Sequence, residues 1–228
     1  QQCDDVPGGP VRHLYLQPLA VGNIKINYAF QSVSDIIIIG EWDWTKDFMG
    51  SIYMISDTHF GDAGAILKYE GRPFKDGHEM NEQMIENWNR VVGAEDTVYH
   101  LGDFACGMDV DGMKAILGRL NGYKVLIAGN HDRDFDSRSW MDMGFDEVSF
   151  LPVILDEFFI LSHEPMYVNI YSPYANIFGH VHNNPMYADV SERSFCACVE
   201  RIGYAPAAFE AIRKGILEAD RKGMEQGR

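Results

Sequence analysis

From Met49 onward, short apolar runs alternate with longer stretches in which apolar residues recur every three or four positions. The short runs predict strands, because a strand needs few residues and most of these runs are followed by glycine or a polar residue. The predicted strands cover residues 51–56, 97–101, 124–128, 147–150, 158–161, 177–178 and 195–200.

The periodic stretches predict helices between these strands. Residues 79–92 and 109–120 each carry an apolar stripe at helical spacing. A shorter helix is predicted at 137–143, where Gly144 ends it, and Pro206 is expected to begin a C-terminal helix because a first-turn proline loses no hydrogen bond. Strands that alternate with helices predict a layered α/β fold.

The first 48 residues have a different pattern and carry no catalytic motif that we can identify. Apolar runs at 11–16, 23–30 and 35–39 are compatible with strands. We therefore divide the chain into an N-terminal extension of unknown role, 1–48, which we expect to be β-structured, and a domain at 49–228.

Polar residues of the metal-binding type follow the ends of the predicted strands. In a layered α/β fold, a ligand site lies at the carboxyl ends of the strands, where loops gather residues from distant parts of the chain. The residues at these positions are Asp57, His59, Asp103, Asn130, His131, Asp132, His163, His180 and His182.

The residue types fit a site for two divalent cations. Aspartate and histidine suit zinc, manganese and iron. A carboxylate can bridge two cations, which a neutral imidazole cannot do. Two cations about 3.5–4 Å apart can hold a hydroxide and neutralise a phosphoryl group.

Each of these residues also has an ordinary structural interpretation. A single histidine is more often a core or surface residue, and Asp57, Asp103 or Asn130 could be a helix cap or a turn residue. Five of the eight histidines follow predicted strands, however, and this ordered recurrence favours a shared site.

The same residues carry a family resemblance. The ordered blocks are Asp57-x-His59, Gly102-Asp103, Gly129-Asn130-His131-Asp132, a lone His163 and Gly179-His180-x-His182. Together they resemble the calcineurin-like metallophosphoesterase family, and phrases such as Arg72-Pro73-Phe74 are similar to a small bacterial and phage branch of it. The resemblance covers about residues 49–215. It implies a sandwich of two sheets flanked by helices.

The resemblance also implies a role for each residue. Asp57, His59 and His182 would hold the first metal. Asn130, His163 and His180 would hold the second, and Asp103 would bridge the two. His131 would assist the leaving-group oxygen, and Asp132 would orient His131. The cofactors would be two divalent ions, with Mn²⁺ favoured and Fe, Zn or Ni as alternatives.

Other positions refine this interpretation. The second block reads Gly102-Asp103-Phe104 and lacks the Asp-Arg-Gly ending of the family's protein Ser/Thr phosphatases, so that subclass is disfavoured. Arg133 and Arg72 could bind substrate phosphate, because a guanidinium matches its geometry. A structural salt bridge is the alternative for both, and it is favoured for Arg72.

Charge and composition limit the partners. The formal net charge is −15, with 34 acidic and 19 basic residues, which argues against binding long nucleic acid. We see no membrane-spanning run and no secretory signal, and four cysteines are too few for a disulfide framework in a chain of this size. We expect a cytoplasmic protein with a small phosphoester substrate. The oligomeric state is left open.

The function that the sequence predicts is metal-dependent hydrolysis of a phosphoester by a metal-bridging hydroxide. His131 favours a phosphodiester, such as a nucleotide, over a monoester. Two alternatives stay open: a nuclease that acts on short DNA or RNA ends, and a metal-binding scaffold without catalysis.

Overall fold

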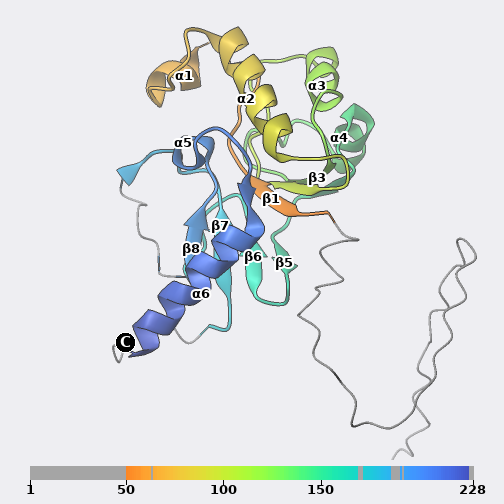
Figure 1. Cartoon of the computed structure of the whole chain (residues 1–228). Helices are drawn as coiled ribbons and strands as arrows, with labels where there is room; N and C mark the ends of the chain where they lie inside the picture. The colour runs from red at the N-terminus through yellow and green to blue at the C-terminus, as the bar shows by residue number, and fades with distance from the viewer. Residues whose placement is uncertain (1–49, 63, 169–171, 186–190, 192, 226–228) are drawn as a thin grey trace, which may run out of the picture. The chain divides into compact units, whose positions relative to one another are not determined.

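The computed structural model describes residues 50–225 with the exception of 63, 169–171, 186–190 and 192 (Figure 1). The strands predicted within 1–48 lie outside the described residues. In the described part of the chain, no helix is both long and apolar enough to cross a membrane.

The first sheet has five strands in the order β4-β3-β2-β1-β9. Strands β1 to β4 run parallel to one another, and β9 pairs antiparallel with β1. Their bounds are β1 (Ile52–Ile55), β2 (Thr97–His100), β3 (Tyr123–Ile127), β4 (Glu147–Ser149) and β9 (Ala207–Ala208). Parallel neighbours need crossover connections, so helices separate them along the chain. The carboxyl ends of β1, β2 and β3 therefore meet at one edge of the sheet.

The second sheet has four strands in the order β5-β6-β7-β8. Strand β5 is antiparallel to β6, whereas β6, β7 and β8 are parallel. Their bounds are β5 (Val153–Leu155), β6 (Phe159–Leu161), β7 (Ala175–Phe178) and β8 (Ser194–Cys196). The isolated bridge between Ser56 and Cys198 joins the two sheets beyond β1 and β8.

Helices cover the first sheet on one side, and α6 lies beside the second sheet (Figure 1). Helices α2, α3 and α4 lie together beyond the first sheet in that view. The helix bounds are α1 (Ala65–Tyr69), α2 (Gly77–Val91), α3 (Val110–Leu117), α4 (Ser137–Met143), α5 (Val199–Ile202) and α6 (Phe209–Glu225).

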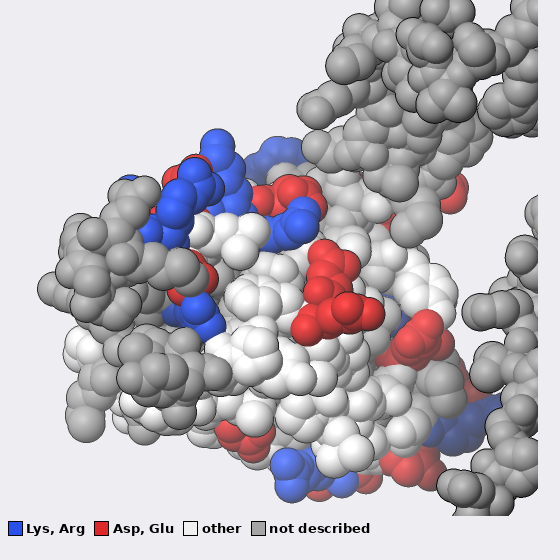
Figure 2. Space-filling model, turned by 90° about the horizontal axis from the view of Figure 1, so that it is seen from below, with Lys and Arg blue, Asp and Glu red and all other residues white. Residues whose placement is uncertain are grey.

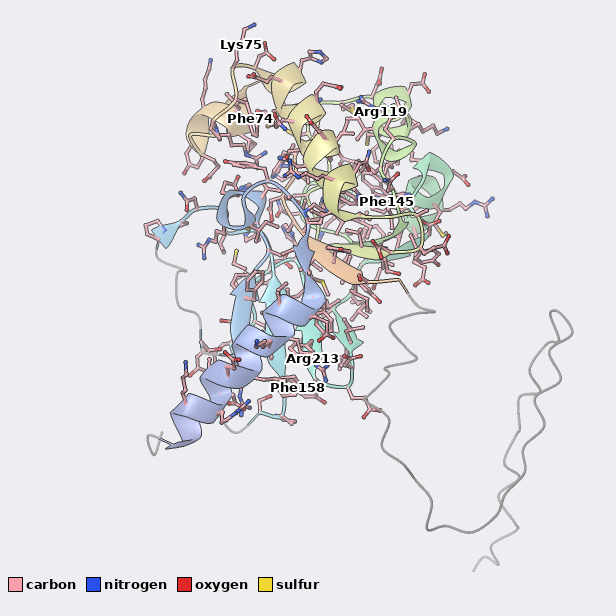
Figure 3. All side chains as sticks on the ribbon, viewed as in Figure 1. Phe74, Lys75, Arg119, Phe145, Phe158 and Arg213 are labelled. Atoms are coloured by element: carbon pink, nitrogen blue, oxygen red, sulfur yellow. The ribbon has the colours of Figure 1, made fainter. Side chains whose placement is uncertain are left out.

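Two hydrophobic cores lie on the two faces of the first sheet. In β1, Ile55 belongs to the core beneath α2, α3 and α4, while its neighbour Met54 belongs to the core shared with the second sheet and α6. Burial on both faces is expected of a parallel sheet. Phe145, labelled in Figure 3, packs edge-on against Phe104 and Trp140 in the first core, with ring centroids 5.2 and 5.8 Å apart.

The predicted two-sheet α/β architecture is confirmed, with two local corrections. The strand predicted at 195–200 ends at Cys196, because the chain leaves the sheet and Val199 enters the first core at the start of α5. The C-terminal helix begins at Phe209 and not at Pro206, because Ala207 and Ala208 pair with β1 as β9.

Candidate metal centre

The predicted site residues follow five different strands and converge on one region. Asp57 and His59 come after β1, Asp103 after β2 and Asn130 after β3, while His163, His180 and His182 follow β6 and β7. Potential metal-ligand atoms from these segments form two groups, and within each group they lie within 4.8 Å of one another. The convergence follows from the topology, because the strands that precede these loops are parallel in both sheets.

The first group consists of Asp57, His59 and His182. Asp57 Oδ1 lies 3.6 Å from His182 Nε2 and 4.0 Å from His59 Nε2. The rings of His59 and His182 stack with their centroids 5.2 Å apart. Asp57 and His59 are fully buried. Such spacing suits atoms that each lie about 2.1 Å from a shared cation.

The second group consists of Asp103, Asn130, His163 and His180. His163 Nδ1 donates a hydrogen bond to the carbonyl of Leu101 at 2.8 Å, so in a neutral ring Nε2 carries a lone pair. That nitrogen lies 3.0 Å from Asn130 Oδ1, and His180 Nδ1 lies 2.9 Å from the same oxygen. His163 Nε2 and Asn130 Oδ1 are then both acceptors. They cannot bond to each other, and a cation beside them would satisfy both.

The carboxylate of Asp103 lies between the two groups. Its Oδ2 atom is 3.7 Å from His59 Nε2, and its Oδ1 atom is 3.5 Å from His163 Nε2. Oδ1 also accepts a hydrogen bond from the backbone N–H of His131 at 2.9 Å. One oxygen therefore faces each group, which is the arrangement that a bridging carboxylate requires.

Several polar atoms of the first group lack a hydrogen-bond partner among the described residues. They are Asp57 Oδ1 and both ring nitrogens of His59, and all three are buried. Leaving a buried polar group unpaired costs about 1–3 kcal/mol, so native structures rarely tolerate it without a purpose. A divalent cation beside Asp57 Oδ1 and His59 Nε2 would satisfy those two atoms, so the residues present fit a metal.

Burial also sets the protonation state of His59. It lowers the pKa of His59 to about 2, and the nearby charges of His182 and Arg72 act in the same direction. The ring is therefore neutral at physiological pH, as a metal-binding imidazole must be. Burial raises the pKa of Asp57, whereas His163 and His182 oppose this effect. A bound cation would favour the ionised carboxylate.

Backbone strain is concentrated at these residues. Among the described residues, the non-glycine positions with positive φ include Asp57 at 58°, His59 at 47°, Asp103 at 57°, His180 at 70° and His182 at 47°. This left-handed conformation costs of order 1–3 kcal/mol per residue, and such residues cluster at functional sites.

A family model described as calcineurin-like phosphoesterase matches residues 50–179, which include the first four sequence blocks and Gly179 of the fifth. The chain belongs to the calcineurin-like phosphoesterase family. The family implies metal-dependent hydrolysis of phosphoesters, and the two groups of potential ligands agree with that chemistry.

Relatives of this chain come from archaea, bacteria and phages. The uncharacterized protein MJ1445 of Methanocaldococcus jannaschii is 36% identical over 74% of this chain and 92% of its own length. The gene 66 protein of Mycobacterium phage D29 is 36% identical over 37% of this chain and 42% of its own length. The crystal structure of AQ665 from Aquifex aeolicus, a protein of unknown function, has a TM-score of 0.58 and 26% identity over 72% of this chain and 98% of its own.

His131 lies at the site among residues of different exposure, since Asn130 and His180 are exposed whereas Asp103 and His163 are buried. The side chain of His131 is 49% exposed, and its Nε2 atom is 4.0 Å from Asp103 Oδ2. Asp132 does not orient it as the resemblance implied. The Asp132 carboxylate accepts hydrogen bonds from the backbone N–H groups of Asp103, Phe104 and Gly129 at 2.7, 3.0 and 2.8 Å. Asp132 therefore fixes the loop that presents Asp103.

The structure corrects one of the two arginine predictions. Arg72 is buried, and its guanidinium donates to Glu200 and to the backbone carbonyls of Asp57 and Thr58, so it has a structural role and does not face substrate. Arg133 has a side chain that is 63% exposed and lies 3.9 Å from Glu164. Its contact with substrate stays a prediction.

Two residues near the centre were not predicted from the sequence. Glu200 accepts a hydrogen bond from His182 Nδ1 at 3.0 Å. Burial alone would raise the pKa of Glu200, but that hydrogen bond and the charge of Arg72 outweigh it and hold the pKa below its usual value. Cys198 Sγ lies 3.3 Å from Asp57 Oδ2 and 3.3 Å from Cys196 Sγ as a free thiol. Both residues follow β8, in the segment that the pattern assigned to a continuous strand.

Proposed function

We propose that this chain is a dinuclear metal-dependent phosphodiesterase. The observation that supports it most directly is the position of Asp103, whose two carboxylate oxygens face two separate groups of nitrogen and oxygen ligands. In this proposal Asp57, His59 and His182 hold the first cation, and Asn130, His163 and His180 hold the second. Asp103 bridges them.

The ligand set favours Mn²⁺, with Fe, Zn and Ni as alternatives. It combines imidazole nitrogens with carboxylate and amide oxygens and contains no thiolate among the proposed ligands, which suits divalent ions of borderline hardness. When bound, two such ions would lower the pKa of water and neutralise the phosphoryl charge. The chain itself supplies the orientation of every ligand and excludes water from Asp57 and His59.

His131 is the proposed proton donor to the leaving oxygen. It is half exposed, so a substrate can reach its ring. Its backbone N–H is held by Asp103 Oδ1, which fixes the residue next to the proposed bridge. Proton transfer at Nε2 would help an alkoxide to leave. Asn130 would stabilise the charge that develops on the phosphoryl oxygens.

Two hollows of different size adjoin the proposed centre. The larger, of about 980 Å³, is bordered by His180 and His182 and by the side chain of Tyr69, which is 86% exposed. The smaller, of about 130 Å³, is bordered by His131, with Phe135 and Met113 behind it. A diester carries two alcohol groups, and two hollows beside one phosphoryl position favour it over a monoester. The larger one has the size of typical small-molecule sites.

The charge around the larger hollow disfavours a nuclease. Glu70 and Glu164 border it and would repel a polyanionic strand. On the face drawn in Figure 2, Lys and Arg side chains lie mostly at the upper left, with others at the lower edge and the right, and Asp and Glu side chains lie between them, so they form no continuous basic stripe across the described residues there. A scaffold without catalysis has less support, because the proposed ligands converge as a working centre would need.

The test is hydrolysis of bis-p-nitrophenyl phosphate by the purified protein with Mn²⁺, Fe²⁺, Zn²⁺ or Ni²⁺, together with elemental analysis. Asp103→Asn removes the bridging charge, so turnover should be lost and the metal content should fall from two per chain to one or none. Asp142→Asn, a substitution of an exposed aspartate paired with Arg138, is the matched control and should change neither quantity. Normal turnover and two metals in Asp103→Asn would refute the proposal.

A screen of nucleotide monoesters and diesters with the same metals tests whether the substrate is a diester. A diester preference is expected. Activity confined to monoesters would overturn the diester assignment and leave the metal centre in place. Release of nucleotides from short DNA or RNA ends would revive the nuclease alternative.

A further inference from the structure

A buried ion pair between Arg72 and Glu200 lies against the first ligand group. The two residues are 128 positions apart, in the loop after α1 and on α5, and their side chains are 0% and 3% exposed. Arg72 Nε and Nη2 both donate to Glu200 Oε1, at 2.9 and 2.7 Å. Removing two charges from water costs free energy that their attraction often does not recover, so stability alone does not explain a buried pair of this kind.

Arg72 holds the turn that presents Asp57 and His59. Its Nη2 atom donates to the carbonyl of Asp57 at 2.7 Å, and Nη1 donates to the carbonyl of Thr58 at 2.8 Å. Asp57 and His59 both have left-handed backbone conformations, which are costly unless their surroundings impose them. A guanidinium has the rigid fork needed to hold two successive carbonyls and a carboxylate at once.

Glu200 fixes the ring of His182. Its Oε1 atom accepts from His182 Nδ1 at 3.0 Å, and because a carboxylate only accepts, the proton of the neutral ring lies on Nδ1. The lone pair is then on Nε2, which faces Asp57 Oδ1 at 3.6 Å. A carboxylate behind a histidine commonly selects the tautomer and orientation that bind a metal.

We propose that Arg72 and Glu200 are positioning residues that together build the first metal site and act on it selectively. Apart from the bridging Asp103, this one ion pair contacts every part of the first site. Arg72 holds the turn of Asp57 and His59 through its carbonyls, and Glu200 holds the ring of His182. This inference rests on the proposed dinuclear centre.

The second ligand group is oriented by other contacts. His163 is held by the Leu101 carbonyl, and Asn130 Oδ1 lies 3.0 Å from His163 Nε2 and 2.9 Å from His180 Nδ1. The direct link between the two groups, apart from Asp103, is the backbone N–H of His180, which donates to Asp57 Oδ2 at 2.8 Å. Loss of the Arg72–Glu200 pair should therefore affect the first site more than the second.

A rival explanation is a separate cation site formed by Glu70, His182 and Glu200, whose potential ligand atoms also lie within 4.8 Å of one another. The guanidinium of Arg72 already contacts the Oε1 atom of Glu200, and its positive charge would repel a cation there. Glu200 Oε2 is buried and has no hydrogen-bond partner among the described residues, so the contacts of Oε1 favour orientation of His182 while Oε2 leaves the rival site to be tested. The number of metals per chain separates the two explanations.

The test is a titration of the metal-free protein with Mn²⁺, followed by electron paramagnetic resonance and elemental analysis. Wild type should bind two ions with a spin-coupled spectrum. Glu200→Ala should weaken binding of one ion about 10–100-fold and leave a mononuclear six-line spectrum, because outer contacts of a ligand are typically worth that much. Glu200→Gln keeps an acceptor for His182 Nδ1 and should recover part of the affinity. Glu82→Ala removes half of the exposed Glu82–Arg119 ion pair and is the matched control, with two ions expected.

The outcomes are distinguishable. A wild-type protein that binds no Mn²⁺ would refute the proposed function, and with it the premise of this inference. Two tightly bound ions in Glu200→Ala, or equal weakening of both in a folded variant, would refute selective positioning. Three ions in wild type and two in Glu200→Ala would establish the rival cation site. If Glu200→Ala does not fold, Arg72→Lys replaces it, because lysine keeps the charge and loses the fork; the same selective weakening is expected.

Discussion

At the scale of single residues, His131 differs from the other histidines of the site because it belongs to neither ligand group, and its ring is half exposed. We expect His131→Ala to keep both metals. Hydrolysis of an alkyl diester should slow about 10²–10⁴-fold, because an alkoxide needs a proton, whereas a nitrophenyl ester should be affected much less. Rates on both esters and the metal content are the measurements.

The comparison variant for that prediction is His180→Ala. It removes a proposed ligand, so it should lose metal and slow both esters together. Equal rate losses on both esters for His131→Ala, with the metals retained, would exclude proton donation by His131 and leave only stabilisation of charge.

A different prediction concerns His100 and the way the stability of the metal-free protein depends on pH. Thr58 Oγ1 donates to the carbonyl of Phe104 at 2.7 Å, so it accepts from His100 Nε2 at 3.0 Å and the ring is neutral. Burial lowers the pKa of His100 to about 3, with the charge of His163 acting in the same direction. The unfolded chain binds a proton near pH 6.5, so the stabilising contribution is complete above that pH and is lost as pH falls toward 3.

The slope should be about 1.4 kcal/mol per pH unit for this one residue. His100→Gln can still donate to Thr58 and does not titrate, so its free energy of unfolding should fall less than that of wild type between pH 6.5 and 5. Urea unfolding at several pH values measures this, with His78→Gln at an exposed position as control. Identical pH profiles for wild type and His100→Gln would contradict the prediction.

The residues that converge at the site could be predicted at this scale, but the residues behind them could not. Asp57, His59 and His182 stand in ordered blocks that the sequence displays directly. Glu200 lies on α5 and Arg72 in the loop after α1, and these two residues, 128 positions apart, meet only when the chain folds. The role of Asp132 was also inferred wrongly, because adjacency to His131 in sequence does not reveal that its carboxylate faces three backbone N–H groups.

At the scale of elements, those with a clear apolar run or helical period were predicted, whereas several short elements without one were not. Helices α2 and α4 and strands β1, β2 and β3 lie where the apolar pattern placed them, within a few residues. Strand β5 was missed because it has three residues, and one of them, Ile154, is 53% exposed at the sheet edge. Helix α5 was read as part of a strand because its four residues are too few to show a helical period.

The interior of α6 offers a prediction about helix stability. Gly215 lies in this helix, is exposed, and has open space where a Cβ would be. Glycine in a helix interior is about 0.8–1.0 kcal/mol less favourable than alanine. Gly215→Ala should therefore raise the free energy of unfolding by about that amount, measured by urea denaturation, without changing the metal content.

Ala211→Gly is the matched control for this prediction, since it lies one turn earlier on the exposed side of α6. It should lower the free energy of unfolding by a similar amount. A destabilised Gly215→Ala variant would mean that another part of the molecule packs closely on that side of the helix.

At the scale of the whole molecule, two cores on the two faces of one sheet hold the site in place. The first core fixes β1, β2 and β3 from the helical side, and the second joins β1 and β3 to β6 and β7. The proposed ligands follow these same strands, so both cores must form before the centre can assemble. The role of residues 1–48 does not follow from the sequence, because this segment has apolar runs but no catalytic motif that we can identify.

The last prediction concerns a shortened chain that begins at Met49. The family match starts at residue 50, and every proposed ligand and positioning residue lies between Asp57 and Glu200. Such a chain should therefore bind two Mn²⁺ ions and hydrolyse bis-p-nitrophenyl phosphate at a rate close to that of the full chain, while its stability or choice of natural substrate can differ. Circular dichroism would verify folding and elemental analysis the metal content. A folded, metal-loaded short chain without activity would show that the first 48 residues complete the active site, because nothing else would separate the two proteins.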